Sequence, residues 1–268
     1  MTSHLQHNSA SDGSMSTGTA APALRVDSLV KRFGGLVVAD DITFELQPGE
    51  TKCLIGPNGA GKSTFVNLVT GFAVPDAGSV HLDGEDITSL GTSKRRQLGI
   101  ARTFQTARVL EEASLFANVL LALRFRTRPS ALMRRSRSSA EERERVDWAL
   151  SQVGLHARAD AVSGSLPHGQ KRLLEIAMAL ADTPKVLLLD EPAAGMSSRE
   201  TEEVAQVIRS VRGGIATLVI DHDMTFIRQL DTAVAVLHRG ALVRQGRIDD
   251  LQSDPFVQEI YLGVPDHD

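Results

Sequence analysis

The stretch Gly56-Pro57-Asn58-Gly59-Ala60-Gly61-Lys62-Ser63-Thr64 decides the fold of this chain. Residues 51–55 before it are predicted to form a short strand, and residues 63–70 after it a helix that ends at Gly71. A glycine-rich turn between a strand and a helix points backbone N–H groups inward, and the helix N-terminus adds the positive end of its dipole. The sequence therefore predicts a phosphate-binding loop, with a chance glycine-rich turn as the alternative.

Two side chains of this stretch fit the chemistry of a bound nucleotide. Lys62 is placed to reach the β- and γ-phosphates, and the Ser63 hydroxyl is placed to bind Mg²⁺. The predicted ligands are therefore ATP and Mg²⁺. The predicted nucleotide contacts within the loop are Gly56, Pro57, Asn58, Gly59, Ala60, Gly61, Lys62, Ser63 and Thr64.

An apolar run far downstream ends in two carboxylates. Residues 186–189 are all apolar, which is typical of a parallel strand buried on both faces. Asp190 follows at the end of that strand, where α/β sheets place their functional residues, and we expect it to act on the Mg²⁺ shell. Glu191 comes next and is placed to orient a water against the γ-phosphorus. A helix-capping Asp-Glu-Pro turn is the alternative, and the presence of Lys62 and Ser63 argues against it.

A second helix N-terminus is predicted between these two motifs. The segment Leu166-Pro167-His168-Gly169-Gln170 precedes an amphipathic helix over residues 171–181. The N-terminus of that helix is another anion site. One chain hardly needs two such helix ends for one ATP. We therefore predict a head-to-tail dimer, in which Gly169 and Gln170 meet the ATP held by the partner's loop.

The order of these elements resembles that of ATP-binding-cassette ATPases, whose signature usually reads Leu-Ser-Gly-Gly-Gln. The resemblance extends from about residue 23 to the end of the chain. It implies an α/β fold with a P-loop NTPase (RecA-like) core, an antiparallel β subdomain and an inserted helical subdomain. Residues 23–268 would form one ATPase domain, with residues 23–105 and 183–268 in the nucleotide-binding core and residues 106–182 in the helical subdomain.

The resemblance also implies roles for three further residues. Phe33 resembles the aromatic that stacks on adenine, and Gln105 resembles the glutamine that contacts Mg²⁺ and water and couples to a membrane partner. His222 resembles the histidine that contacts the γ-phosphate. Singly, each has an ordinary alternative: a core aromatic, a surface amide and a satisfied strand-end histidine. The implied catalytic set is Lys62, Gln105, Glu191 and His222, and the implied metal set is Ser63, Gln105 and Asp190.

The chain departs from the family pattern in two places. Pro167 stands where the signature serine is usual, and His168 replaces the first signature glycine. Ser197 replaces the usual aspartate of the segment after Glu191, which puts communication across the dimer through that residue in doubt. These changes leave open the alternative that the chain is a regulatory module that binds ATP without hydrolysing it. We favour an active enzyme because the chain carries the full implied set of Lys62, Gln105, Asp190, Glu191 and His222.

Finer motifs resemble the ATPase subunits of bacterial branched-chain amino-acid importers and of their urea- and amide-importing relatives. They include residues 33–36, 68–72, 101–105, 174–177, 190–196 and 261–263. This resemblance implies an ATPase that energises a membrane importer, lying at the cytoplasmic face of the cell membrane. The implied partners are permease subunits, a second ATPase subunit and an external solute-binding protein. An exporter of lipid-like cargo and a non-transport ATPase of the same fold are the alternatives.

Composition agrees with an α/β protein of one piece. The chain has 268 residues, a hydrophobic content of 42% and no apolar run long enough to span a bilayer. The net charge of −4 gives no support to nucleic-acid binding, and the single cysteine, Cys53, suits a reducing compartment. We expect Cys53 to pack in the core, although its alkylation could block ATP. Residues 1–22 are rich in Ser, Thr, Ala and Gly and are predicted to be a disordered tail.

Several local signals predict further elements. Residues 80–82 before Asp83-Gly84 predict a strand and tight turn, and strands are expected near Ala216 and Ala233. Ser139 begins a capping box, and Ser197 begins a helix predicted to stop at Gly213-Gly214. Six arginines between Arg124 and Arg137 could attract lipid headgroups or a permease, but we favour a solvated surface insertion.

Overall fold

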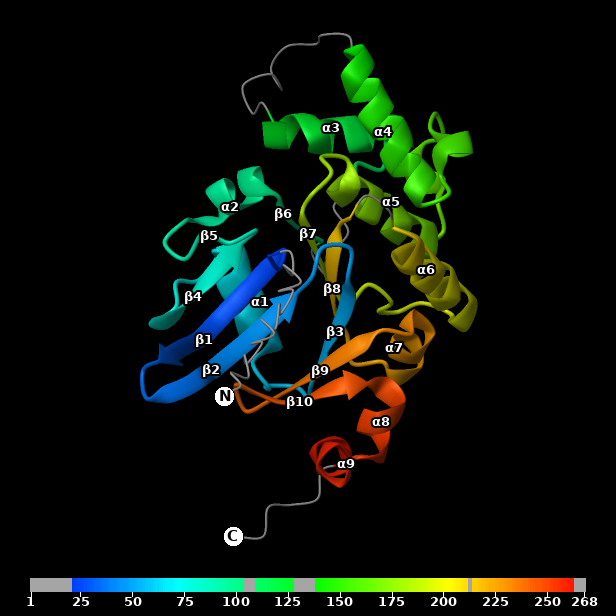
Figure 1. Ribbon diagram of the computed structural model, residues 1–268. Coiled ribbons are helices and arrows are strands. Elements are labelled where there is room, and N and C mark those ends of the chain that lie inside the picture. Colours follow the sequence, from blue (N-terminus) through cyan, green and yellow to red (C-terminus); the bar gives the residue numbers. More distant parts are fainter. Residues whose placement is uncertain (1–20, 104–108, 128–137, 212–213, 263–268) are drawn as a thin grey trace, which may run out of the picture.

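Six strands form the central sheet of the computed structural model, which describes residues 21–103, 109–127, 138–211 and 214–262 (Figure 1). The strand order is β10-β9-β3-β8-β7-β6. The pairs β9–β3, β3–β8, β8–β7 and β7–β6 are parallel, and only the edge pair β10–β9 is antiparallel. The bounds are β3 Thr51–Ile55, β6 Ile100–Arg102, β7 Val186–Asp190, β8 Ala216–Ile220, β9 Ala233–His238 and β10 Ala241–Arg247. The strands predicted at residues 51–55 and 186–189 and near Ala216 and Ala233 are thus confirmed.

Alternate residues of this sheet enter two separate cores. On β7, Leu187 and Leu189 face one core and Leu188 faces the other. The first core packs against three helices, α5 (His168–Leu180), α6 (Ser198–Ser210) and α7 (Met224–Leu230), and continues into α3 (Leu115–Thr127) and α4 (Ala140–Gln152). The second packs against α1 and a smaller sheet. Because both faces are covered, β7, β8 and β9 are apolar at nearly every position, which is why the sequence reveals them.

The smaller sheet is antiparallel, with the order β2-β1-β4-β5. Its strands are β1 Leu24–Phe33, β2 Leu36–Leu46, β4 Ala77–Leu82 and β5 Glu85–Asp86. The tight turn predicted at Asp83-Gly84 joins β4 to β5 and is confirmed. Helix α1, Lys62–Thr70, packs between the two sheets, and Phe65 meets Phe44 of β2 edge to face at 5.6 Å. Helix α2, Thr92–Leu98, follows β5.

Helices dominate the middle of the chain. They are α3 Leu115–Thr127, α4 Ala140–Gln152 and α5 His168–Leu180, with short 3₁₀ turns η2 His156–Arg158 and η3 Ser163–Ser165. The capping box of α4 is present, with Ser139 and Glu142 bonded to each other, as predicted. Figure 1 shows α3 and α4 at one end of the molecule, beyond the edge strand β6. No helix of the described residues is long and apolar enough to cross a membrane.

Two helix boundaries differ from the sequence predictions. Helix α5 starts at His168 rather than at residue 171, because Pro167 takes the N-cap position and lets residues 168–170 form the first turn. Helix α6, Ser198–Ser210, begins at the predicted cap but ends before Gly213, since Val211 adopts an extended backbone. The remaining helices are α7 Met224–Leu230, α8 Ile248–Ser253 and α9 Pro255–Leu262.

The structure leaves parts of the predicted organisation open. The tail proposed for residues 1–22 lies almost wholly outside the described residues, as do Gln105 and most of the predicted arginine-rich insertion. The division into a core of residues 23–105 and 183–268 and a helical subdomain of residues 106–182 stays a prediction.

Candidate functional site

The candidate site lies where three neighbouring parallel strands end. Strand β8 lies between β3 and β7, and Ile220 at its end pairs with Leu54 on one side and with Asp190 on the other. The loop after β3, the carboxylates after β7 and the segment after β8 therefore meet at one edge of the sheet. Carboxyl ends of parallel strands are where α/β proteins bind ligands.

The loop between β3 and α1 requires glycine at two positions. A Cβ on Gly56 would lie 2.2 Å from the carbonyl oxygen of Leu237, and one on Gly61 would lie 2.6 Å from that of Val38. Gly61 also has φ of 104°, which is strained for any other residue. The loop is thus wrapped closely against β9 and β2, and this contact holds it in place at the start of α1.

Lys62 turns back into this loop. Its Nζ donates hydrogen bonds to the carbonyl oxygens of Gly56, at 2.5 Å, and Pro57, at 3.0 Å. Burial lowers the pKa of Lys62, and the nearby carboxylates of Glu191, Asp190 and Asp221 oppose that shift. An ammonium held by two carbonyl groups is able to exchange them for phosphate oxygens.

Glu191 and His222 face each other across the ends of β7 and β8. The Nδ1 of His222 is 3.5 Å from Oε1 of Glu191, and their side chains are 61% and 31% exposed. The backbone N–H of Glu191 donates to Ile220 at 2.8 Å, which ties the two strand ends together. His222 is therefore exposed beside Glu191, and its contact with a γ-phosphate stays a prediction.

Asp190 is buried and held by residues that the sequence analysis missed. Its Oδ2 accepts a hydrogen bond from Nη2 of Arg102 at 2.8 Å. Arg172 of α5 donates to the backbone oxygens of Asp190, at 2.6 Å, and Glu191, at 3.2 Å. These arginines are far from Asp190 along the chain, so no local pattern points to them.

Asp221 is a third carboxylate of the site that the sequence analysis did not single out. It is 2% exposed, and its Oδ1 accepts from the backbone N–H groups of His222, at 2.7 Å, and Asp223, at 3.0 Å. Burial raises the pKa of Asp221, and the two backbone hydrogen bonds counteract this. Its position directly after an apolar strand, like that of Asp190, is the signal that could have found it.

Phe33 is available for stacking. It lies at the end of β1 with 55% of its surface exposed, so its alternative as a core aromatic is wrong. The Nζ of Lys31 lies 5.4 Å from the ring centroid. A half-exposed ring beside a cation is suited to a flat ligand that carries negative charge.

Gly169 and Gln170 have partners other than the loop of residues 56–64. The N–H of Gly169 donates to Oε1 of Glu200 at 3.0 Å, and Oε1 of Gln170 accepts from Arg158 at 2.5 Å. A Cβ on Gly169 would lie 2.9 Å from the Glu200 side chain, so a larger residue here would displace Glu200. Gln105, the last predicted site residue, lies outside the described residues.

Glu200 joins the start of α5 to the start of α6. Its Oε2 accepts from the backbone N–H of Ser197 at 3.0 Å and from its hydroxyl at 2.7 Å. The hydrogen bonds from Ser197 and Gly169 lower the pKa of Glu200 to about 2. In the single chain, this carboxylate occupies the helix end that we predicted to meet a phosphate.

Comparison with known proteins places this geometry in a family. The model described as "ABC transporter" matches residues 39–194, which include the loop and the carboxylates after β7. The chain belongs to the ABC transporter family. It is therefore an ATP-hydrolysing cassette, and such cassettes act in pairs with permease subunits.

Similar proteins cover nearly the whole chain. The high-affinity branched-chain amino acid transport ATP-binding protein BraF of Pseudomonas aeruginosa is 35% identical over 250 residues, which cover 90% of this chain and 98% of BraF. LivG of Escherichia coli K12, named for the same transport, is 34% identical with the same coverage. The lipopolysaccharide export ATP-binding protein LptB of Acidithiobacillus ferridurans is 35% identical over 90% of this chain and 96% of LptB.

Solved structures agree with the fold. An ATP-binding cassette of an ABC transporter in its ADP conformation superposes with a TM-score of 0.81 at 32% identity, over 91% of this chain and 99% of that one. A dimeric cassette bound to ADP and Pi has a TM-score of 0.67 at 25% identity, over 84% of this chain and 98% of that one. The predicted α/β P-loop NTPase fold with an antiparallel β part is thus confirmed.

Proposed function

We propose that this chain is the ATP-hydrolysing subunit of an importer for branched-chain amino acids, or for related small polar solutes such as urea and amides. The observation that carries the proposal is the meeting of Lys62, Asp190, Glu191 and His222 at one sheet edge, in a chain aligned over 90% of its length with BraF and LivG. The meeting of the four side chains supports ATP hydrolysis. The names of the relatives support import as the direction of transport and amino acids as the class of solute.

The loop and Phe33 would bind ATP. Adenine stacks on the exposed ring of Phe33, and the triphosphate lies in the loop from Gly56 to Thr64 at the N-terminus of α1. Lys62 exchanges its two carbonyl partners for phosphate oxygens. Two of the three carboxylates around Lys62, those of Asp190 and Glu191, lie at the end of β7, which supports a reacting phosphate beside Glu191.

The residues at the site fit Mg²⁺ as the accompanying ion. No group of three or more His, Cys, Asp or Glu in the described chain could hold a metal by itself. The donors offered are the exposed Ser63 hydroxyl, the Asp190 carboxylate and, from the sequence, Gln105. Such a sparse oxygen set suits Mg²⁺, which keeps its waters and relies on phosphate ligands. The ion would neutralise phosphate charge during the transfer.

Glu191 and His222 would act on the terminal phosphate. Glu191 accepts a proton from, and orients, the attacking water, while His222 donates a hydrogen bond to a γ-phosphate oxygen. Their 3.5 Å separation supports a joint action on one phosphate. A second cassette would cover this phosphate with Gly169 and Gln170 at the start of its α5, after Glu200 releases the Gly169 N–H.

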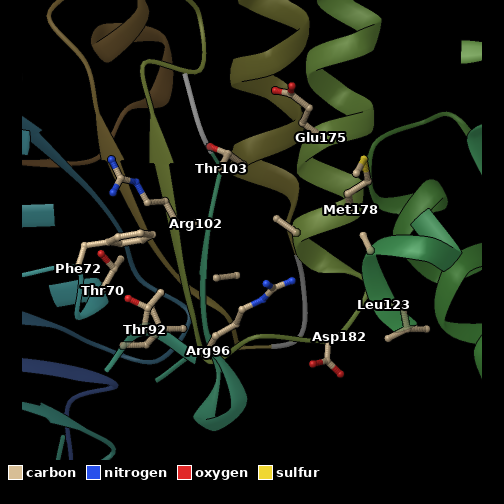
Figure 2. Close-up of a pocket in the computed structure, with 14 residues that line it drawn as sticks. Thr70, Phe72, Thr92, Arg96, Arg102, Thr103, Leu123, Glu175, Met178 and Asp182 are labelled. Carbon is tan, nitrogen blue, oxygen red and sulfur yellow. The ribbon is translucent and has the colours of Figure 1, made fainter. Parts of the chain in front are cut away.

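A cavity in the chain is a candidate docking site for the permease. It has a volume of about 260 Å³ and lies between α2, β6, α3 and α5 (Figure 2), and Thr103, two positions before Gln105 in the sequence, is one of its lining residues. Apolar side chains form half of its lining, and the charged lining residues are Arg96, Arg102, Glu175 and Asp182. We propose that a cytoplasmic loop of the permease docks here, which would keep the chain at the cytoplasmic face of the membrane. An external solute-binding protein would deliver the solute.

Reconstitution of the chain with candidate permease subunits in liposomes tests the proposal. Addition of a solute-loaded binding protein should raise phosphate release and drive solute uptake. The variants Lys62→Ala and Glu191→Gln should abolish both. Phosphate release by the Glu191→Gln variant at the wild-type rate would remove Glu191 from its role.

The similarity to LptB favours a second candidate, the ATPase of an exporter of lipid-like cargo. The same liposomes distinguish the two functions. Stimulation by a lipid extract, without any response to amino acids, urea or amides, would replace the importer with the exporter.

A further inference from the structure

Arg102, at the end of the edge strand β6, contacts the carboxylate that we assign to Mg²⁺. Its Nη2 donates to Oδ2 of Asp190 at 2.8 Å, and its Nη1 donates to Oδ1 of Asn67 on α1 at 2.9 Å. The side chains of Arg102 and Asp190 are 15% and 7% exposed. The pair is thus largely shielded from water, where an ion pair is strong and an isolated charge is costly.

A guanidinium at this distance opposes a metal ion at the same carboxylate. Both are cations, and both need the oxygens of Asp190. Two positive charges within a few ångströms of each other repel strongly where water is scarce. Binding of Mg²⁺ at Asp190 is therefore favoured if the guanidinium weakens its hold or moves away.

The cavity beside Arg102 gives its guanidinium group room to move away from Asp190. Arg102 lines the cavity of about 260 Å³, and the carbon at the centre of its guanidinium lies 6.0 Å from the centroid of the Phe72 ring. Figure 2 shows the two side chains next to each other on the cavity wall. At this distance the ring attracts a cation through its π face, and closer approach would strengthen the attraction.

We propose that Arg102 is a positioning residue that exchanges with Mg²⁺ at Asp190. In the metal-free chain, it neutralises Asp190 and holds its carboxylate in place. When Mg²⁺ arrives with the nucleotide, the guanidinium shifts toward Phe72 and the cavity. This inference rests on the proposed function, because it requires that Asp190 serve the magnesium of bound ATP.

Binding of Mn²⁺, measured by electron paramagnetic resonance with saturating ADP, tests the exchange without any turnover. The neutral variant Arg102→Gln should bind Mn²⁺ at least about threefold more tightly than the wild type, because the competing charge is gone. Arg102→Lys keeps the charge and should bind Mn²⁺ nearly as the wild type does. Arg96→Gln is the matched control: Arg96 lines the same cavity, near Phe125 and Asp182, and its loss should leave the affinity unchanged.

A second variant, Phe72→Leu, covers the case in which Arg102→Gln does not fold. The Phe72 ring is exposed, so its loss should be tolerated, and Arg102 keeps its hold on Asp190. Mn²⁺ should then bind more weakly than to the wild type, because a displaced guanidinium no longer finds the Phe72 ring that attracts it. A purely structural role for Arg102 predicts weaker metal binding in Arg102→Gln, which is the opposite sign.

The outcomes separate this inference from the proposed function. Failure of ADP to promote Mn²⁺ binding in the wild type would overturn both. ADP-dependent binding in the wild type, with unchanged or weaker binding in Arg102→Gln, would overturn the exchange alone. If only Phe72→Leu is folded, an affinity equal to or greater than that of the wild type would overturn it.

Discussion

At the scale of single residues, the site holds charges of both signs next to strands that are almost wholly apolar. Burial lowers the pKa of Lys62 and raises that of Asp221, so each is less favoured in its charged form than in water. Arg102 and Arg172 stabilise the end of β7 through the carboxylate and the backbone oxygens of Asp190. Mg²⁺ and ATP would therefore enter a site in which Lys62 and Asp190 already have partners that a phosphate or a metal ion can replace.

Cys53 should be inert in the native chain. It is fully buried in β3, and burial raises the pKa of its thiol to about 12, so the reactive thiolate is scarce at about pH 8. Intact-mass measurement with iodoacetamide should show no adduct on the folded protein and one adduct after denaturation. Rapid alkylation of the folded protein would mean that the start of the loop opens to solvent, and alkylation would then be able to block ATP.

The residues that sequence analysis found and missed follow a physical rule. The loop, Asp190 and Glu191 were predictable because they lie at the ends of apolar strands, whereas His222 was found through the family resemblance. Arg102, Arg172 and Glu200 act on residues 18 to 88 positions away or across a helix interface, and only the folded chain brings them together. Gln105 falls outside the described residues, so its role stays a prediction.

At the scale of elements, α5 connects the two halves of the proposed reaction. Its first turn presents Gly169, its Arg172 supports β7, and Glu200 ties its start to α6. The sequence predicted the helix but not its first turn, because a proline that usually ends a helix here precedes one. Strands β3 and β7 were placed almost to the residue and β8 and β9 approximately, whereas the three-residue edge strand β6 was not predicted. The bounds of β1 and β2 were not predicted, because their half-exposed antiparallel pattern is weaker in sequence.

The contact between α5 and α6 should depend on pH through Glu200. Its folded-state pKa of about 2 lies below the ordinary value of 4.5, so the ionised carboxylate adds stability above about pH 4.5. That contribution is lost as pH falls from about 4.5 toward about 2. We expect Glu200→Gln to be less stable than the wild type near pH 7 and to approach it as the solution is acidified.

Urea unfolding followed by circular dichroism at several pH values measures this difference. Glu202→Gln is the control, because Glu202 is an exposed glutamate on the same helix and lies outside the capping box. A constant gap between the wild type and Glu200→Gln from neutral to acid pH would show that the charge of Glu200 does not stabilise the contact.

At the scale of the whole molecule, two cores on opposite faces of one sheet form the frame of the described chain. The α1 side carries the antiparallel sheet and Phe33, and the other side carries α5 and α6. The nucleotide loop and the start of α5 belong to different parts of this frame. The loop contacts β9 and β2, whereas Gly169 contacts Glu200. In a head-to-tail pair of cassettes, the loop of one chain and the start of α5 of the other would together form one closed site.

The association state of the Glu191→Gln variant tests this central claim most directly. Sedimentation velocity should show monomers without nucleotide and dimers with Mg²⁺ and ATP, because ATP then binds but is not consumed. Adding Lys62→Ala should return the protein to monomers. A Glu191→Gln protein that stays monomeric while saturated with ATP, or that dimerises equally without it, would contradict the account.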